Sequence, residues 1–240
     1  GVSLLPGRTT DPVHRFADAH HYAEQARVVS PVLAQAAALL AAYVIGSFPT
    51  AYLVGKANGV DLRTVGSGNL GATNVFRTLG WKWGLLVYVV DGLKGALPVI
   101  WLPGALGLAA GWPWGVGFGL LAILGHVRPV FLMGNGGGKG VATASGVFIA
   151  LAPVPALCAI IGFVIVVATT RFVSLGSLVG AVVLPIALWL QQRAVTPLVL
   201  VSAAVGAFVF WTHRENIGRL RRGEERRVGR TASSTPGGRA

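Results

Sequence analysis

The sequence predicts an all-α membrane protein whose chain crosses the bilayer about seven times. Hydrophobic residues make up 53% of its 240 residues and charged residues only 12%, which is about half the charged share of a typical soluble protein. Of the charged residues, eleven lie between residues 31 and 213, and the others lie near the two ends. Because a soluble domain must cover its surface with polar groups, this pattern excludes an ordinary soluble enzyme, a disordered chain and a disulfide scaffold.

Seven apolar stretches are candidates for membrane-spanning helices, each of which needs about 20 residues to cross the hydrocarbon core. They lie at residues 32–57, 81–103, 113–132, 141–153, 154–170, 173–191 and 196–213. The fourth stretch is short, and only Pro153 and Pro155 separate it from the fifth. Counts of five and six spans therefore stay open beside the preferred count of seven.

Basic residues indicate how these spans are oriented. With seven spans, the segments 58–80 and 133–140, the surroundings of Arg171 and the C-terminal tail all fall on one side, and that side carries most of the lysines and arginines. Basic loops mark the cytoplasmic side of a membrane protein. We therefore expect a multi-pass membrane protein with its N-terminus outside and its C-terminus in the cytoplasm.

The chain divides into three parts by composition. Residues 1–30 form a polar extension with a short helix expected at about 14–28, residues 31–213 form the transmembrane domain, and residues 214–240 form a basic tail that we expect to be disordered after about 226. The net charge of +12 fits a tail lying beside anionic lipid. No nucleic-acid partner is expected, because the basic residues form no soluble face.

The first polar island in the apolar chain runs from residue 66 to residue 80. It contains Gly-x-Gly-x-x-Gly, but no strand precedes it, so a dinucleotide site is rejected. Backbone amides of such a glycine loop can still turn inward and bind an anion. If a short helix follows, Arg77 lies one turn after Asn74. The residues expected to converge here are Ser67, Gly68, Asn69, Asn74 and Arg77; the alternative is an ordinary polar loop.

The second polar island, residues 134–143, looks like a nucleotide-binding P-loop but fails its test. Met133 and Gly140 stand where that motif requires glycine and a hydroxyl residue, so ATP hydrolysis is not predicted. Glycines before a lysine at the start of a helix still make a phosphate cradle. Its members are Gly137, Gly138, Lys139, Gly140 and Thr143; the alternative is a flexible turn with an interfacial lysine.

Two ionisable residues, Asp91 and Lys94, lie inside the second span. Their i, i+3 spacing places them on one helix face, where they can pair. Ionisable residues within a span usually face protein or water and mark function, but a neutralising structural pair is an equal alternative. His126, at the end of the third span, is interpreted as structural.

Two further polar clusters adjoin the predicted cytoplasmic ends of the later spans. Ser174 and Ser177 lie where the sixth span begins, and helix capping is their alternative role. His213 and Asn216 share a helix face at i, i+3 spacing after the last span; the alternative is a lipid-facing basic helix.

The clusters and islands together supply cations and free amides with few carboxylates. Such a site suits phosphate-bearing substrates and is poorly suited to Mg²⁺, and no metal or cofactor is expected.

Taken in order, these motifs resemble those of the bacterial acyl-phosphate-dependent glycerol-3-phosphate acyltransferases, the PlsY family. The resemblance extends from about Val44 to Glu225. The matching strings are GSGNLGATNVFRTLG (66–80), DGLKGALPV (91–99), GHVRPVF (125–131), GGKGVAT (137–143), RFVSLGS (171–177) and HRENIGRL (213–220).

The resemblance implies the reaction and the partners. The enzyme is expected to transfer a fatty acyl group from acyl phosphate to the 1-hydroxyl of glycerol-3-phosphate, giving lysophosphatidate and phosphate in the first step of phospholipid synthesis. Expected partners are these two substrates, the lipid bilayer and the soluble phosphate acyltransferase that makes the donor. No histidine here is followed five positions later by aspartate, so the catalytic dyad of other glycerolipid acyltransferases is absent. The alternative function is transport of an organic phosphate anion.

The resemblance also implies roles for individual residues. Ser67, Arg77 and Lys139 are expected to hold phosphate groups, assisted by the glycine amides. Ser177, Ser174, His213 and Asn216 complete the glycerol-3-phosphate site. The proton of the attacking hydroxyl goes either to His213 or to a substrate phosphate; we favour the phosphate, in which case His213→Ala should damage glycerol-3-phosphate binding.

Overall fold

The computed structural model describes residues 31–108 and 113–229, and all regular structure in these residues is helical. A helix over 31–46 precedes α2 (Thr50–Ala57), α3 (Ala72–Leu79), α4 (Trp81–Ala105), α5 (Trp114–Val127), the 3-10 turn η1 (Val130–Leu132), α6 (Val141–Leu151), α7 (Pro153–Thr170), α8 (Val173–Gln192), α9 (Pro197–Thr212) and α10 (Arg214–Arg221). The chain divides into two compact units, Gly1–Ala38 and Leu39–Ala240. The expected helix at 14–28 lies outside the described residues.

Among the described residues, five segments are long and apolar enough to cross a membrane, and the bent pair α9–α10 makes a sixth candidate. The stretch expected as the fourth span is shorter than the sequence suggested. Its helix α6 has 11 residues and so extends about 16 Å, roughly half of the hydrocarbon thickness. Ala152 leaves the helical conformation and Pro153 starts α7, which agrees with the predicted break at the prolines.

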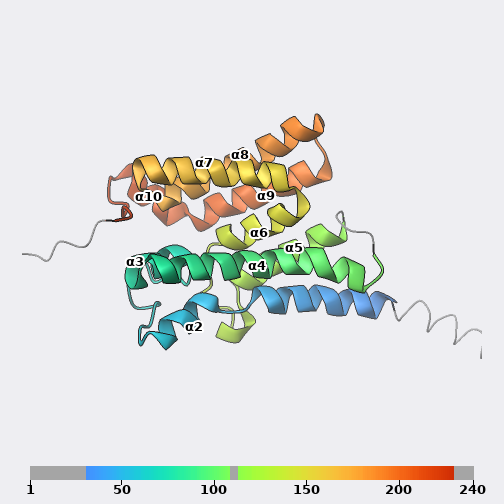
Figure 1. Ribbon diagram of the computed structural model, residues 1–240, viewed down its shortest axis with the longest axis horizontal. Helices are drawn as coiled ribbons and strands as arrows, with labels where there is room; N and C mark the ends of the chain where they lie inside the picture. The colour runs from blue at the N-terminus through green and yellow to red at the C-terminus, as the bar shows by residue number, and fades with distance from the viewer. Residues whose placement is uncertain (1–30, 109–112, 230–240) are drawn as a thin grey trace, which may run out of the picture. The chain divides into compact units, whose positions relative to one another are not determined.

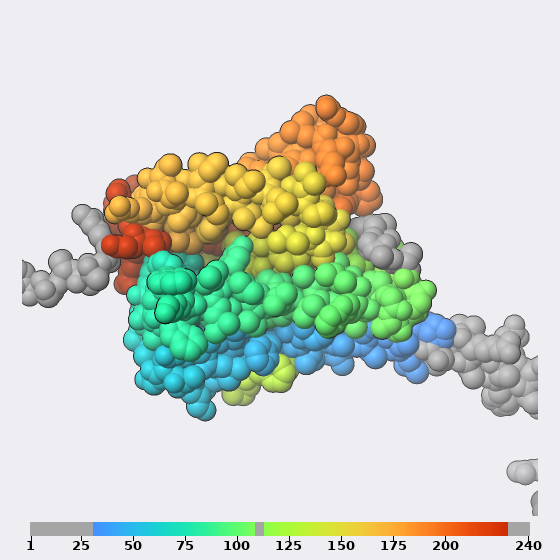
Figure 2. All heavy atoms as spheres, viewed as in Figure 1, coloured from blue at the N-terminus to red at the C-terminus, as the bar shows by residue number. Residues whose placement is uncertain are grey.

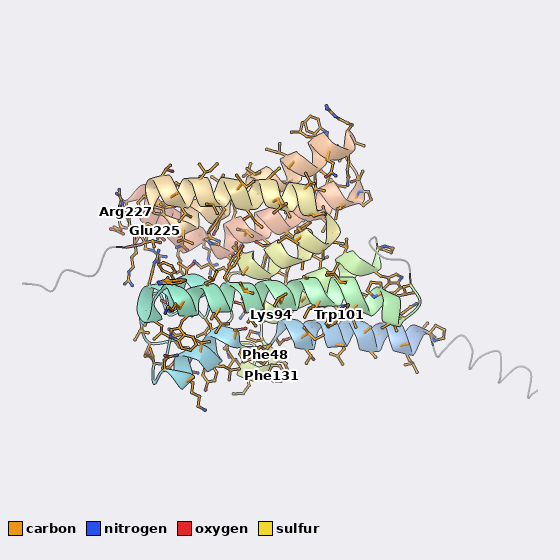
Figure 3. The ribbon with its side chains drawn as sticks, viewed as in Figure 1. Phe48, Lys94, Trp101, Phe131, Glu225 and Arg227 are labelled. Carbon is orange, nitrogen blue, oxygen red and sulfur yellow. The ribbon has the colours of Figure 1, made fainter. Side chains whose placement is uncertain are left out.

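The helices pack in two groups within the second unit. In one group α7 packs on α8 and α8 packs on α9; in the other, α4 packs on α3, α5 and α6. Helix α6 also contacts α7, so it lies between the two groups (Figure 1). Many large apolar side chains face outward, among them Trp101 of α4, which is 65% exposed (Figure 3). A soluble protein would bury most of this surface, so the outer faces agree with a multi-pass membrane protein.

Small residues allow α4 and α6 to approach closely. A Cβ on Gly146 would overlap the carbonyl oxygen of Gly92, and one on Gly95 would overlap the carbonyl oxygen of Thr143. Small residues at such crossings are typical of membrane helix packing, where backbones come into contact. This close contact holds the start of α6, and the glycine loop before it, against the middle of α4.

The described chain continues beyond α10 as far as residue 229. The amide of Val228 donates to the carbonyl of Arg171 at 2.9 Å, and Arg226 accepts a hydrogen bond from Arg77. Figure 2 shows this C-terminal segment, in red, between α3 and the α7–α8 group. The tail therefore returns to the body of the protein instead of leaving it at α10.

Candidate active site

A polar cavity of about 740 Å³ lies where α3, the loop before α6, the start of α8 and the α9–α10 junction meet. It brings together segments that lie far apart in the chain. Most of the residues predicted from the sequence line it: Ser67, Asn69, Asn74, Arg77, Lys139, Gly140, Ser174, Ser177, His213 and Asn216. The polar islands therefore meet at one cavity through these ten residues.

Asn74 shapes the first glycine loop. Its side chain is buried, its Oδ1 accepts from the amide of Ser67 at 3.0 Å, and its Nδ2 donates to the carbonyls of Leu62 and Val65 at 3.1 Å. Gly66 next to this contact has φ +63°, a conformation that favours glycine. All the hydrogen-bonding atoms of the Asn74 amide are thus used within the loop, so this residue holds Ser67 in place and does not itself offer a free group to a ligand.

Asn69 joins the glycine loop of the first polar island to that of the second, since its Nδ2 donates to the carbonyl of Gly137 at 3.3 Å. Gly140 follows Lys139 with φ +83° and is the N-cap of α6, with no side-chain cap. The first amides of a helix have no partner within the helix, and they carry the positive end of its dipole. The start of α6 therefore offers N–H groups to an anion in the cavity.

Lys139 extends into the cavity and donates to Oδ1 of Asn216. Burial, together with the nearby positive charges of Arg219 and Arg77, lowers the pKa of Lys139 to about 8, against the opposing effect of Glu225 and Glu215. An anion bound beside the ammonium group would restore its charge. Lys139 is thus a cation of the cavity lining whose charge depends on pH near neutrality.

We expect the binding of an anionic substrate to weaken as pH rises through about 8. Binding weakens in this direction because the pKa of Lys139 is lowered. Below about pH 8 the ammonium group is charged and attracts a phosphate, and above that pH it is neutral. The second-order rate constant kcat/KM reports ionisation of the free enzyme, so it should fall above pH 8 while kcat changes less. Steady-state kinetics from about pH 6.5 to 9.5 measure this, and an unchanged kcat/KM across that range would contradict it.

Glu225 is the main cavity residue that the sequence reasoning missed. Its carboxylate is buried and accepts hydrogen bonds from Ser174 (3.0 Å), Asn216 (2.8 Å) and Arg219 (2.9 Å). Burial alone would raise the pKa of Glu225, but these three hydrogen bonds outweigh it and lower the pKa. Because Asn216 donates its Nδ2 to Glu225, its Oδ1 is turned toward Lys139. In the sequence, Glu225 appears only as a glutamate within a run of arginines. No local pattern reveals its partners, which lie far away in the chain.

Arg77 is fixed by the returning tail. Its Nη2 donates to the carbonyl of Arg226 at 2.7 Å, while its buried Nε has no hydrogen-bond partner among the described residues. A buried donor without a partner is costly, so a ligand that accepts from Nε would be favoured at this position. The same segment places Glu225 and Arg227 at the end of the bundle beside α10 (Figure 3).

The charged residues of the cavity lining, counted with the cations that pair with its carboxylates, leave a positive balance. Two carboxylates belong to the lining, and each has a cationic partner: Arg219 lies 2.9 Å from Glu225, and Lys94 lies 2.8 Å from Asp91. Arg77 and Lys139 also line the cavity, and neither forms an ion pair within the described part of the chain. Two cations are therefore available to an anionic ligand.

Four of the predicted binding residues do not line the cavity: Gly68, Gly137, Gly138 and Thr143. Gly137 and Gly138 form the rear of the cradle and face a smaller cavity behind it. Thr143 is fully buried, and its methyl group and carbonyl oxygen face Gly95 of α4. Threonine at this position packs two helices together, which the sequence motif could not distinguish from substrate binding.

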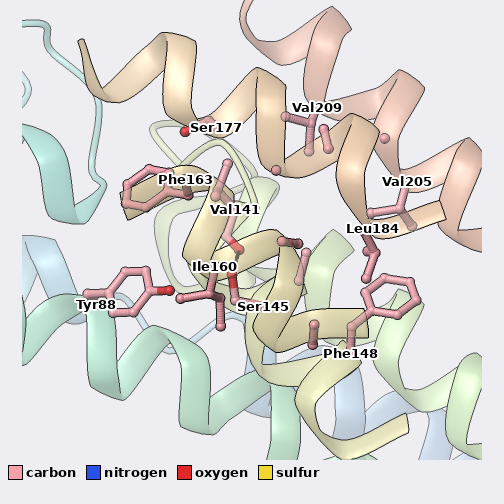
Figure 4. Close-up of a pocket in the computed structure, with 16 residues that line it drawn as sticks. Tyr88, Val141, Ser145, Phe148, Ile160, Phe163, Ser177, Leu184, Val205 and Val209 are labelled. Atoms are coloured by element: carbon pink, nitrogen blue, oxygen red, sulfur yellow. Dashed lines mark hydrogen bonds between the residues drawn. The ribbon is translucent and has the colours of Figure 1, made fainter. Parts of the chain in front are cut away.

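An apolar groove of about 610 Å³ opens from the polar cavity (Figure 4). The two share Tyr88, Val141, Phe163 and Ser177. From this shared wall the groove runs between α6, α7, α8 and α9 toward Phe148, Leu184 and Val205, and small residues such as Gly180 and Ala181 form its sides. The sequence reasoning placed no groove here, because these residues look like ordinary span residues in the sequence. The combined site can thus hold a molecule with a charged head and an apolar chain.

Asp91 and Lys94 form the predicted pair, with 2.8 Å between Nζ and Oδ1. His126, which the sequence reasoning interpreted as structural, lies beside Asp91, with 3.8 Å between its Nδ1 and the second carboxylate oxygen. Both Asp91 and His126 belong to the cavity lining. This buried cluster therefore forms part of the wall of the site.

Comparison with known proteins identifies relatives over most of the chain. The family model described as glycerol-3-phosphate acyltransferase matches residues 36–223. The glycerol-3-phosphate acyltransferase of Geobacter sulfurreducens is 47% identical over 187 residues, which cover 78% of this chain and 93% of that protein. The enzyme of the same name from a strain of Thermus thermophilus is 47% identical over 194 residues, covering 80% and 94%.

Two solved structures are similar as well. The crystal structure of PlsY (YgiH), an integral membrane glycerol 3-phosphate acyltransferase, in its glycerol 3-phosphate form has a TM-score of 0.74 and 39% sequence identity, covering 81% of this chain and 96% of that one. The form with lysophosphatidic acid has a TM-score of 0.72 and 37% identity, covering 81% and 95%.

Proposed function

The chain belongs to the glycerol-3-phosphate acyltransferase family, and from this premise we propose that it transfers a fatty acyl group from an acyl phosphate to the 1-hydroxyl of glycerol-3-phosphate. The products are lysophosphatidate and inorganic phosphate. The acyl carbon leaves the phosphate oxygen and forms an ester with the glycerol oxygen, and the hydroxyl proton ends on phosphate. This reaction would open phospholipid synthesis in the cell that makes the protein.

The observation that carries the proposal is the junction of the polar cavity with the apolar groove. Both expected substrates carry a phosphate, and the donor also carries a fatty chain. The cavity offers Arg77 and Lys139 to the phosphates, while the groove offers an apolar path that begins at the shared wall of Tyr88, Val141, Phe163 and Ser177. The reacting carbonyl would then lie at this wall, between head and chain.

The residues at the junction favour catalysis by positioning and charge stabilisation. An acyl phosphate already has a good leaving group, so a strong protein nucleophile is unnecessary. Holding two reactants in line can supply several kcal/mol of the barrier reduction, and fixed positive charges stabilise the oxyanion and the departing phosphate. We propose that Ser67, Arg77 and Lys139 hold the phosphate groups, with Asn216 and Ser177 beside them.

His213 is better suited to accept a hydrogen bond than to act as the general base. Its Nδ1 lies 2.8 Å from the carbonyl of Val209; because a carbonyl can only accept, Nδ1 carries the proton and Nε2 has the free lone pair. A catalytic imidazole is usually backed by a carboxylate that stabilises its charged form, whereas a neutral carbonyl backs His213. This supports the proposal that a substrate phosphate takes the proton.

We also propose the cellular setting. The site lies among the predicted cytoplasmic segments, so the enzyme would work at the cytoplasmic face of the bacterial cell membrane. A water-soluble phosphate acyltransferase would supply the acyl phosphate from that side. The lysophosphatidate would leave sideways into the bilayer, because the groove lies between helices whose outer surfaces are apolar.

Filling the groove should weaken donor binding selectively. Ala181 lines the groove, whereas the next residue, Val182, is 45% exposed on the outer face of α8. We expect Ala181→Phe to raise the KM for palmitoyl phosphate at least about fivefold, as overpacking by about 1–3 kcal/mol would, with the KM for glycerol-3-phosphate little changed. Val182→Phe is the matched control, and equal kinetics for the two variants would contradict the groove assignment.

The direct test uses purified protein in detergent, palmitoyl phosphate and labelled glycerol-3-phosphate, without added Mg²⁺. Labelled lysophosphatidate is the expected product. Product with palmitoyl-CoA but none with palmitoyl phosphate would show that the proposed donor is wrong. Labelled glycerol-3-phosphate that accumulates unmodified inside vesicles would instead favour transport.

A further inference from the structure

A buried polar cluster lies behind the glycine cradle and is not used by the chemistry proposed above. It consists of Thr50 at the start of α2, Asp91 and Lys94 on α4, and His126 at the end of α5, all of them buried. The backbone of Phe48 adds a further segment of the chain to it. We propose that Asp91 is a positioning residue that acts through His126. Together they hold the cradle, and Lys139 with it, in the position from which Lys139 contacts glycerol-3-phosphate. This inference rests on the proposed function.

The first oxygen of Asp91 anchors the carboxylate. Its Oδ1 accepts from the hydroxyl of Thr50 at 2.9 Å and from Nζ of Lys94 at 2.8 Å. Lys94 also donates to the carbonyl of Phe48 at 2.8 Å, and Figure 3 shows these two residues close together. Two rigid elements therefore fix the carboxylate. The pair is neutral as a whole, so it does not repel an anion in the adjacent cavity.

The second oxygen of Asp91 faces His126. Oδ2 is buried, has no hydrogen-bond partner among the described residues, and lies 3.8 Å from Nδ1 of the imidazole. A buried carboxylate oxygen is costly to leave unpaired, so it favours the ring orientation that turns Nδ1 toward it. That orientation directs Nε2 to the opposite side, toward the cradle.

His126 contacts the cradle directly. A Cβ on Gly138 would overlap Nε2 of His126, and the amide of Gly138 donates to the carbonyl of His126 at 3.2 Å. The imidazole therefore fills the space that a side chain at position 138 would need, and the loop rests on the ring. Lys139 is the next residue, so a shift of the ring moves the ammonium group and the amides at the start of α6.

The test must separate positioning from mere stabilisation of the fold. Asp91→Asn alone would leave Lys94 charged and unpaired in the interior, which is strongly destabilising. The double variant Asp91→Asn, Lys94→Met is neutral and similar in shape. If Asp91 only stabilises the fold, this variant should keep the wild-type affinity for glycerol-3-phosphate; if Asp91 positions the cradle, it should fold and bind that substrate poorly.

We expect the double variant to unfold near the wild-type temperature in detergent and to raise the KM for glycerol-3-phosphate at least about tenfold, as misplacement of a binding group by a fraction of an ångström does. The KM for palmitoyl phosphate should rise less, because the groove that takes its fatty chain lies apart from the cluster. A wild-type KM for glycerol-3-phosphate in the folded double variant overturns the proposal.

A second variant covers the case in which the double variant does not fold. Thr50→Val removes one hydrogen bond to Asp91 without changing any charge. Ser202→Ala is its control, since within the described chain that buried hydroxyl donates only to the carbonyl of Val199 in its own helix. Thr50→Val should raise the KM for glycerol-3-phosphate about threefold or more, which corresponds to about 0.7 kcal/mol, and Ser202→Ala should not. Equal KM values for the two variants overturn the proposal.

Binding of glycerol-3-phosphate, measured by calorimetry in detergent, keeps the two proposals separate. A wild-type protein that binds this substrate but forms no product contradicts the proposed function, and the dissociation constants of the variants still decide the role of Asp91. Weaker binding in the Asp91 and Thr50 variants supports positioning, and unchanged binding overturns it.

Discussion

Lys139→Met should lower kcat/KM at least about 100-fold. Lys139 is the cation of the cradle, it lines the cavity, and no carboxylate pairs with it among the residues that the structure describes. Removing one partner of a desolvated charged contact costs about 2–5 kcal/mol, and about 3 kcal/mol corresponds to roughly 100-fold. Methionine keeps most of the length and apolar surface of the lysine stem, so the loss reports the charge. Steady-state kinetics with both substrates measure it.

Lys82→Met is the matched control for this variant. Lys82 lies on α4 with its Nζ over the ring of Trp81, at 5.9 Å from the centroid, and it does not line the cavity. Its loss should leave kcat/KM within about twofold, in line with other surface substitutions. The assignment of Lys139 to phosphate binding fails if Lys139→Met also stays within about twofold while the protein remains folded.

Of the single methyl groups that could be added to the cradle, the one added by Gly137→Ala should lower kcat/KM the most. Its Cβ would overlap the carbonyl oxygen of Val127, a backbone atom at the end of α5. Since backbone cannot yield as a flexible side chain can, the loop must move away from α5, and the carbonyl of Gly137 would lose its hydrogen bond from Asn69. We expect kcat/KM for glycerol-3-phosphate to fall about 100-fold, as a displacement of about 1 Å can cause.

Gly104→Ala provides the comparison for that variant. Gly104 lies in α4 with nothing within 4 Å of an added Cβ, and alanine is the better helix former. Its kinetics should match those of the wild type, and its unfolding temperature should be equal or slightly higher. Were Gly137→Ala to behave in the same way, the cradle would be a flexible turn and not a fixed binding element.

Much of the site could be predicted because its signals are local. Glycines beside a lysine at a helix start, and polar residues in an otherwise apolar chain, indicate their chemistry without knowledge of the fold. The spacing of Asp91 and Lys94 on one helix face likewise predicted their pairing. Most of the predicted residues line one cavity for this reason. Gly68 and Thr143 do not, because a motif shows which residues occur together and not which way each one faces.

The sequence by itself determined that the chain lies in a membrane and that its polar islands are basic. A scarcity of charge over residues 31–213 requires a membrane environment, and islands of glycine, lysine and arginine favour an anionic ligand. The tertiary structure alone decided what depends on distant contacts. Glu225 reaches Ser174 across 51 positions of the chain, the groove arises where four helices meet, and α6 proves to be half a span. The physical reason is that side-chain chemistry is encoded residue by residue, whereas cavities and buried pairings arise from helix packing that no short segment specifies.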